Sequence, residues 1–214
     1  MSHDAAGFGP SFEVLDAAEF DRVKSLYAPL AGAVRDLIDA TIWTQADEDV
    51  VADAQAAIEA ATQSLRQKTR PTGVSFVTDG HPVPLANAAI GPCNPIAPPM
   101  IVHREEDGHC WSEFVLGSAY EGPPGLVHGG VSALLLDHIL GEVASEGMTK
   151  PRFTGTITVK YLRGTPLGPL RADAFHDRTE GVKTYARGSI SDAAGITVEA
   201  EGVFIQPSWA REAE

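Results

Sequence analysis

EGPPGLVHGGVSALLLDHILGEVASEG, residues 121–147, is the segment that decides the fold. Glycine and proline at its start predict a turn, and the apolar run after them predicts a helix. One acidic residue, Asp137, interrupts that run, and its sequence neighbours on both sides are apolar: Leu134, Leu135, Leu136, Ile139, Leu140 and Val143. A carboxylate in such surroundings is either paired with a hydrogen-bond donor or placed there for chemistry.

The start of the predicted helix is a second candidate for chemistry. His128, Gly129 and Gly130 stand where a helix has free backbone N–H groups and the positive end of its dipole. Glycine lets a ligand approach the backbone, and such a place can polarise a carbonyl oxygen. Asp137 follows Gly130 on the same side of the helix but about 10 Å further along its axis. Asp137 therefore cannot directly reach a carbonyl held by Gly130 of the same helix, so an acid from a partner subunit or a different ligand path is needed. The structural alternative for Asp137 is a buried carboxylate that is bonded to a backbone group or a serine. The structural alternative for His128 is a histidine whose hydrogen bonds are satisfied within the turn.

Alternating residues predict strands on both sides of this helix. Two short strands, 100–104 and 110–116, flank a turn with an Asp-Gly pair, which is typical of a hairpin. Four more strands are expected, and their short connections favour an antiparallel meander: 152–162, 169–178, 182–191 and 195–205. In the first of these, the polar residues share one face: Thr154, Thr156, Thr158 and Lys160.

The fold class that these elements predict is α+β. A curled six-stranded antiparallel sheet should surround one long central helix, because a helix that is apolar nearly all round must be enclosed. The chain has no βαβ alternation, which excludes a Rossmann fold or a parallel barrel.

The first third of the chain predicts a helical extension. Apolar residues recur at three- and four-residue steps from residue 16 to residue 42, and Pro29 is expected to divide them into two helices. A third helix should run from about Asp47, a good N-cap, to about Lys68. These helices bury little by themselves, so they should pack on the main domain or on a partner subunit. The predicted division is a helical extension, 1–70, an irregular linker, 71–99, and the sheet domain, 100–207.

The linker is rich in proline, glycine and asparagine, as in GPCNPIAPP. Long irregular connections in compact domains are often functional, so Asn94 and the carbonyl groups around it are candidates for contact with a ligand. The alternative is a structural turn, because an Asn-Pro pair marks turns on its own.

Charge excludes some functions and suggests one partner. The net charge of −13 argues against general nucleic-acid binding. Residues 150–187, however, hold 8 basic and 3 acidic residues, so this segment could receive a phosphorylated ligand. The alternative is that exposed strands carry Lys and Arg for solubility and edge protection.

Other features point to a protein of the cytoplasm. The N-terminus has no pattern of a signal peptide, and no apolar run approaches the ~20 residues of a membrane-spanning helix. Cys93 and Cys110 form no CxxC pair, which favours a reducing compartment. The sequence has no Gly-x-Ser-x-Gly, P-loop or GxGxxG motif. No metal site is expected, since Asp137 and His138 point about 100° apart on a helix.

At residues 122–137, GPPGLVHGGVSALLLD and the elements after it resemble the hotdog-fold acyl-CoA thioesterases, in the branch of phenylacetyl-CoA-type enzymes. The resemblance covers about residues 90–206 and leaves out the helical segment 13–68. It implies an acyl-CoA thioesterase that needs no cofactor, since coenzyme A is part of the substrate. It also implies a homodimer, or a dimer of dimers, with the active site between subunits. The carbonyl would then lie at Gly130 of one subunit, and Asp137 would come from the other.

The resemblance also implies roles for single residues. Asp137 would act as general base or as nucleophile, and the Gly130 N–H, together with Gly129, would polarise the thioester carbonyl. His128 would position the thioester or the loop, and Thr154 would orient water or the acid. Arg163 and Lys160 would meet the phosphates of coenzyme A. Some relatives have Asn six residues before the histidine, where this chain has Gly122.

Two other functions are rivals to hydrolysis for a chain of this fold. A non-catalytic acyl-CoA-binding or regulatory protein of the same fold would use the helical extension to dock a partner. A dehydratase or hydratase would need His–Asp or His–Glu motifs that the chain lacks. The sequence does not specify the acyl chain, or whether the acyl group is aromatic or aliphatic.

Overall fold

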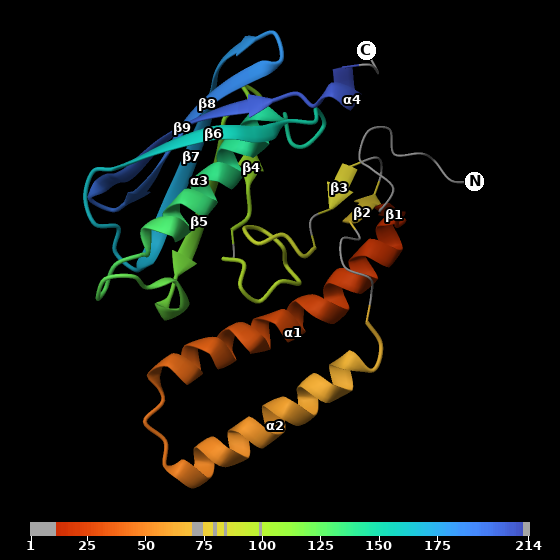
Figure 1. Cartoon of the computed structure of the whole chain (residues 1–214), viewed down its shortest axis with the longest axis vertical. Coiled ribbons are helices and arrows are strands. Elements are labelled where there is room, and N and C mark those ends of the chain that lie inside the picture. Colours follow the sequence, from red (N-terminus) through yellow and green to blue (C-terminus); the bar gives the residue numbers. More distant parts are fainter. Residues whose placement is uncertain (1–11, 70–74, 79–80, 84, 99, 212–214) are drawn as a thin grey trace.

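A computed structural model describes the chain except for residues 1–11, 70–74, 79–80, 84, 99 and 212–214. Its largest element is an antiparallel sheet of six strands in the order β4-β5-β7-β8-β9-β6 (Figure 1). The strands are β4 His103–Arg104, β5 Cys110–Leu116, β6 Phe153–Tyr161, β7 Gly168–Glu180, β8 Lys183–Asp192 and β9 Gly195–Ile205. One helix, α3 Gly129–Ala144, packs against this sheet. The predicted six-stranded sheet with a central helix is therefore confirmed.

The core lies between α3 and the sheet. Leu135, Leu136, Ile139 and Leu140 are fully buried on the side of α3 that faces the strands. Glycines let the helix approach closely: a Cβ atom on Gly188 of β8 would lie 3.2 Å from Leu140 Cδ2. The prediction that α3 is enclosed on every side needs correction, however. Gly130 and Leu134 are exposed and Asp137 is half-buried, so one stripe of the helix stays uncovered.

The order of the strands differs from the predicted four-strand meander. β7, β8 and β9 do follow one another, but β6 pairs with β9 at the far edge of the sheet, and β7 pairs with β5. The connection 162–167 reaches across β8 and β9, a distance of about 14 Å at ordinary strand spacing. A chain of that length spans up to about 20 Å, so a short connection did not require β6 and β7 to be neighbours.

The predicted hairpin is present, with a shorter first strand. β4 and β5 pair antiparallel, and Gly108 in their turn has φ of +85°, a conformation that suits glycine. After β5 come a short 3₁₀ helix, η1 Ser118–Tyr120, and the glycine-rich turn that leads into α3. A last short helix, α4 Ser208–Arg211, follows β9.

The helical extension has two helices where three were predicted. α1 Ala17–Trp43 is continuous and contains Pro29, so the expected break at that residue is wrong. A proline removes one backbone hydrogen bond, and the remaining bonds of a helix this long keep both halves in one element. α2 Glu48–Arg66 begins after Asp47 as predicted. The two helices are joined by residues 44–47 and run back along each other, with α1 between α2 and the rest of the chain (Figure 1).

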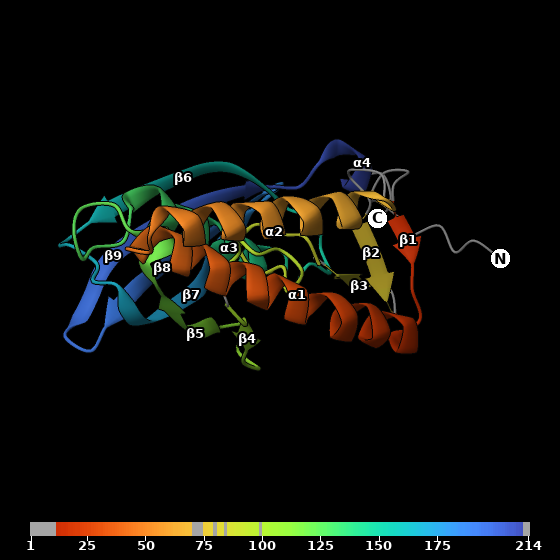
Figure 2. The same ribbon diagram turned by 90° about the horizontal axis from the view of Figure 1, so that it is seen from below.

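Along one side, α1 is attached to the segment that precedes the sheet domain. Val23 is buried with Leu85, and the Arg35 guanidinium donates hydrogen bonds to the carbonyl oxygens of Asn94 and Ala97 at 3.0 and 3.2 Å. Figure 2 shows both helices along one flank of the molecule. Among the described residues, no helix is long and apolar enough to cross a membrane.

The sequence predicted an irregular segment 71–99, but part of this segment forms strands. β2 Ser75–Thr78 and β3 His81–Val83 form a small sheet with β1 Phe12–Val14, in which β1 and β2 are parallel. Ser-Phe-Val-Thr is a run suited to a strand, but its partner β1 lies more than sixty residues earlier, which a local pattern cannot reveal. The predicted boundary at residue 70 falls outside the described residues and stays a prediction.

Candidate active site

His128 forms the cap at the start of α3. Its Nδ1 accepts a hydrogen bond from the Gly130 N–H at 3.0 Å, and its own backbone N–H donates to the Tyr120 carbonyl at 2.9 Å. The Tyr161 hydroxyl donates to the Gly129 carbonyl at 2.8 Å. A Cβ atom on Gly129 would lie 3.3 Å from the Tyr161 ring, so glycine permits this close approach of β6 to the helix start.

Asp137 meets Thr154 across the space between α3 and β6. The Thr154 hydroxyl donates a hydrogen bond to Asp137 Oδ1 at 2.9 Å. A carboxylate that accepts one such bond keeps further lone pairs for a proton or for an electrophile. The two sequence-predicted residues are therefore brought together, and Asp137 is neither fully buried nor bonded to a backbone group.

A bulge in β6 turns Thr154 toward the helix. Thr154 pairs with Phe204 and Thr156 with Val203, so Gly155 is an extra residue between them. Phe204 faces the core, and paired residues of an antiparallel sheet share a face, so Thr154 faces the core side as well. Strict alternation would have placed Thr154 on the outer face with Thr156, as the sequence had predicted. β-bulges next to functional sites often redirect a side chain in this way.

A cavity of about 250 Å³ begins at Asp137 and Thr154 and follows the second half of α3. Its walls include Asn87, His138, Gly141, Met148, Phe153 and Phe204. His138 Nε2 lies 3.4 Å from Glu142 Oε1, and both side chains are largely buried. Asp137 and His138 thus line one cavity, although they leave the helix in different directions. Within the described ranges, no cluster of His, Cys, Asp or Glu could hold a metal ion.

Asn94 is used within its own loop. Its Nδ2 donates to the Ala86 carbonyl at 3.1 Å, and its Oδ1 accepts from the Ile96 N–H at 3.1 Å, which is the geometry of a structural turn. The residue of this segment that lines the cavity beside Asp137 is Asn87. Both residues are asparagines in a loop, and no local signal in the sequence distinguishes them.

Arg163 is held by its own chain. Its guanidinium binds the Asp192 carboxylate and donates to the Gly195 carbonyl at 2.8 Å, so it closes the turn between β8 and β9. The hydrogen bond from Arg163 lowers the pKa of the Asp192 carboxyl to about 2. Lys160 is exposed on β6 at a position that pairs with Glu199. Neither cation is among the residues of the cavity at Asp137.

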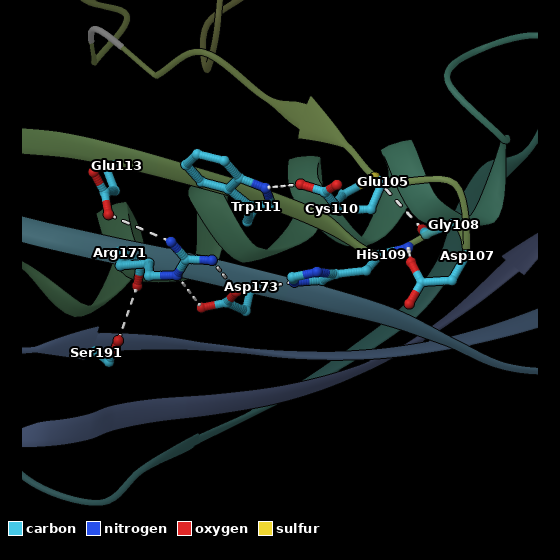
Figure 3. A network of polar contacts seen from close by, with 10 residues as sticks. All are labelled: Glu105, Asp107, Gly108, His109, Cys110, Trp111, Glu113, Arg171, Asp173 and Ser191. Carbon is cyan, nitrogen blue, oxygen red and sulfur yellow. Dashed lines mark hydrogen bonds and ion pairs between the residues drawn. The ribbon is translucent and has the colours of Figure 1, made fainter.

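Other cations of the basic segment are also held within the chain. Figure 3 shows Arg171 on β7, which donates two hydrogen bonds of 2.9 Å to Asp173 and lies 3.3 Å from Glu113. His109 Nε2 lies 2.9 Å from the same Asp173 carboxylate (Figure 3). Arg178 pairs with Asp177 and Glu180. These contacts favour a structural role for Arg171 and Arg178, whereas Lys150 and Arg152 of the same segment line the cavity at Asp137.

Comparison with known proteins links this chain to one superfamily. The profile of the thioesterase superfamily matches residues 124–199. A crystal structure of a thioesterase superfamily protein shares 30% identity with a TM-score of 0.73, covering 84% of this chain and 94% of that one. A match of that extent includes part of the helical extension.

Two further solved structures each match 50% of this chain. A phenylacetic acid degradation-related protein from Ralstonia eutropha JMP134 has 21% identity, a TM-score of 0.47 and 84% of its own chain covered. The protein smu.793 from Streptococcus mutans UA159, solved with acetyl CoA, has 18% identity, a TM-score of 0.47 and 88% covered. Comparison with curated proteins by sequence found no match.

Proposed function

The chain belongs to the thioesterase superfamily, and from that premise we propose that it hydrolyses an acyl-CoA thioester to a free acid and coenzyme A. One observation carries the proposal. The Asp137 carboxylate is held by the Thr154 hydroxyl at 2.9 Å, beside a cavity, on the one stripe of α3 that the sheet leaves uncovered. A carboxylate placed in this way can act on a thioester carbonyl.

The chemistry needs only water and the chain's own groups. With Asp137 as general base, a water oxygen attacks the carbonyl carbon while its proton passes to the carboxylate. The C–S bond then breaks, and the thiolate of coenzyme A takes up a proton. With Asp137 as nucleophile, the carboxylate attacks the carbonyl carbon, the C–S bond breaks and the thiolate of coenzyme A leaves; water then hydrolyses the resulting anhydride to the free acid and the Asp137 carboxylate. The site geometry is compatible with both routes.

The thioester oxygen would lie at the start of α3. The Gly130 N–H is occupied by His128 Nδ1 at 3.0 Å, so the oxygen would replace the imidazole as the acceptor of that hydrogen bond. His128 then serves as the acceptor that satisfies this N–H between reactions. The Gly129 N–H would be the second backbone donor next to this oxygen.

A second subunit is part of the proposal, because Gly130 and Asp137 lie about 10 Å apart along one helix. β6 is an edge strand whose outer side has no partner strand among the described residues. Such an edge is a template for pairing with another chain. The uncovered stripe of α3 lies next to it, since Thr154 and Tyr161 of β6 contact both ends of that stripe. Pairing two β6 edges would bring two such stripes together.

The acyl group would occupy the cavity beside Asp137, and coenzyme A would extend toward the exposed end of β6. Lys160 is free to meet its phosphates there. The Arg163 guanidinium would bind a phosphate either while it still contacts the Asp192 carboxylate or after it leaves that carboxylate. No cofactor takes part in this reaction.

Release of free coenzyme A from a panel of acyl-CoA esters tests the proposed function. The panel should contain short, medium, long and aromatic acyl groups, and a thiol reagent reports the product. We expect turnover of at least one class with saturation kinetics. Tight binding of acyl-CoA without turnover of any member would contradict hydrolysis and favour the non-catalytic alternative.

Thr154→Ala is expected to lower kcat/KM roughly 10- to 100-fold, because a hydrogen bond to a charged group is worth about 1.5–3 kcal/mol. Thr154→Ser should retain most of the activity. Thr158→Ala, on the outer face of the same strand, is the matched control. A Thr154→Ala protein as active as the parent would contradict the role of this hydroxyl.

A further inference from the structure

α2 is a long helix that the described part of its own chain leaves uncovered. None of its residues is buried, and Val50 and Leu65 near its two ends are 56% and 54% exposed. Val51 and Ile58 are also exposed. In proteins, most of the stability of a helix comes from packing of its apolar face. The face of α2 therefore calls for a partner that one copy of the chain does not supply.

The apolar face of α2 is symmetric about its centre. Its members recur at steps of three, four and one, and form one stripe: Val50, Ala54, Ala57, Ile58, Ala61 and Leu65. Counted from the midpoint between Ala57 and Ile58, each of these positions has a mirror position in the same set. Two copies of α2 that run in opposite directions would thus place apolar residues opposite apolar residues along the whole stripe. A two-fold contact requires this self-complementarity.

The charged residues of α2 are arranged about the same midpoint, with negative charge at one end and positive charge at the other. Acidic residues gather at the start of α2, namely Asp47, Glu48, Asp49 and Asp53, whereas Arg66 and Lys68 stand at its end. Asp47 and Lys68 are themselves mirror positions about the same midpoint. An antiparallel pair would place the acidic end of each helix beside the basic end of the other. A parallel pair would place like charges together at both ends.

α1 adds a second apolar surface beside α2. One side of α1 is attached through Val23 and Arg35 to the segment that precedes the sheet domain, but Leu26, Leu30 and Leu37 are exposed. Two antiparallel helices joined by a short loop, with apolar residues left bare on both, form half of a four-helix bundle. The small alanines of α2 would let the helices of two copies approach closely.

We propose that α2 pairs antiparallel with α2 of a second copy of this chain, with Ala57 and Ile58 next to the two-fold axis, and that the two α1–α2 hairpins form a four-helix bundle. This contact is separate from the pairing of β6 edges and does not depend on thioesterase activity. It makes the helical extension an assembly element that joins copies of the chain.

Ile58→Glu tests this contact, because it places two carboxylates at the axis of the bundle. Glu is at least as good a helix former as Ile, and the side chain is exposed in the single chain, so the helix itself should persist. Light scattering coupled to gel filtration measures the molar mass. We expect half the molar mass of the parent protein, with unchanged helix content by circular dichroism.

Gln63→Glu is the matched control, since it adds the same charge about 140° around the helix. It should keep the parent's mass. As a second measurement, a short bis-maleimide should join two copies of Ile58→Cys but not of Gln63→Cys, with the parent as blank. An Ile58→Glu protein of parental mass would overturn the proposal, and so would equal cross-linking of the two cysteine variants. Packing of α2 on α1 of the same chain would give these contrary results.

Discussion

Asp137→Asn is expected to lower kcat by about a thousandfold, within the 10²–10⁴ range that a positioned base contributes. Asparagine has the shape of aspartate and can still accept the hydrogen bond of Thr154 through Oδ1, so the local structure should persist. It cannot take a proton from water at neutral pH or attack a carbonyl as a carboxylate does. Hydrolysis of the best acyl-CoA ester from the panel measures the effect.

Glu146→Gln is the control for a lost carboxylate near the end of the same helix. Glu146 is exposed and does not itself line the cavity, although Lys150, with which it pairs at 2.7 Å, does. It should leave kcat close to that of the parent. If Asp137→Asn hydrolyses the ester at the parental rate, Asp137 is neither base nor nucleophile, whatever the activity of the protein.

Gly130→Pro is expected to lower kcat by about 10²–10³, the usual effect of losing one oxyanion donor. Proline removes the N–H, and the first turn of a helix tolerates it because that N–H has no partner within the helix. The cap from His128 to this N–H is lost as well, at about 1 kcal/mol of stability. His128→Ala loses the same cap but keeps the N–H, so it should be equally destabilised in urea and considerably more active.

Mixing the two inactive proteins tests whether the site is shared. If Asp137 comes from one subunit and Gly130 from the other, a hybrid of Asp137→Asn and Gly130→Pro chains has one intact site. Random exchange in equal amounts should restore about one quarter of the parental activity, since half of the dimers are hybrids with one working site each. A mixture that is no more active than its components after exchange would contradict the shared site.

Most of the sheet domain could be predicted from the sequence because its signals are local. Alternating residues and glycine turns located all the strands of the large sheet, and the apolar run with its glycine-rich start located α3. Pairing between distant strands carries no such signal. The place of β6 beside β9, and the parallel pair of β1 and β2, depend on how the chain curves around the core.

The candidate site was predicted in outline, and its details were not. Asp137, His128 and the glycines after it follow from a pattern of spacing, and the structure places them on α3 as expected. Asn94 and Arg163 had side chains suited to a ligand, yet both are engaged by their own chain. Their partners, Ala86 and Asp192, are brought to them by folding, so the residue types alone could not reveal this.

By itself, the sequence determined the elements and the chemistry available to them: a helix that starts with free N–H groups, an acid two turns later, and strands on either side. Local periodicity and the spacing of a helix are sufficient for that. Only the tertiary structure decided which groups meet. The extra residue Gly155 turns Thr154 to Asp137, and the crossing of β6 to the sheet edge leaves a strand and a helix stripe uncovered beside each other. Both depend on register and strand order, which are set by contacts between residues far apart in the chain.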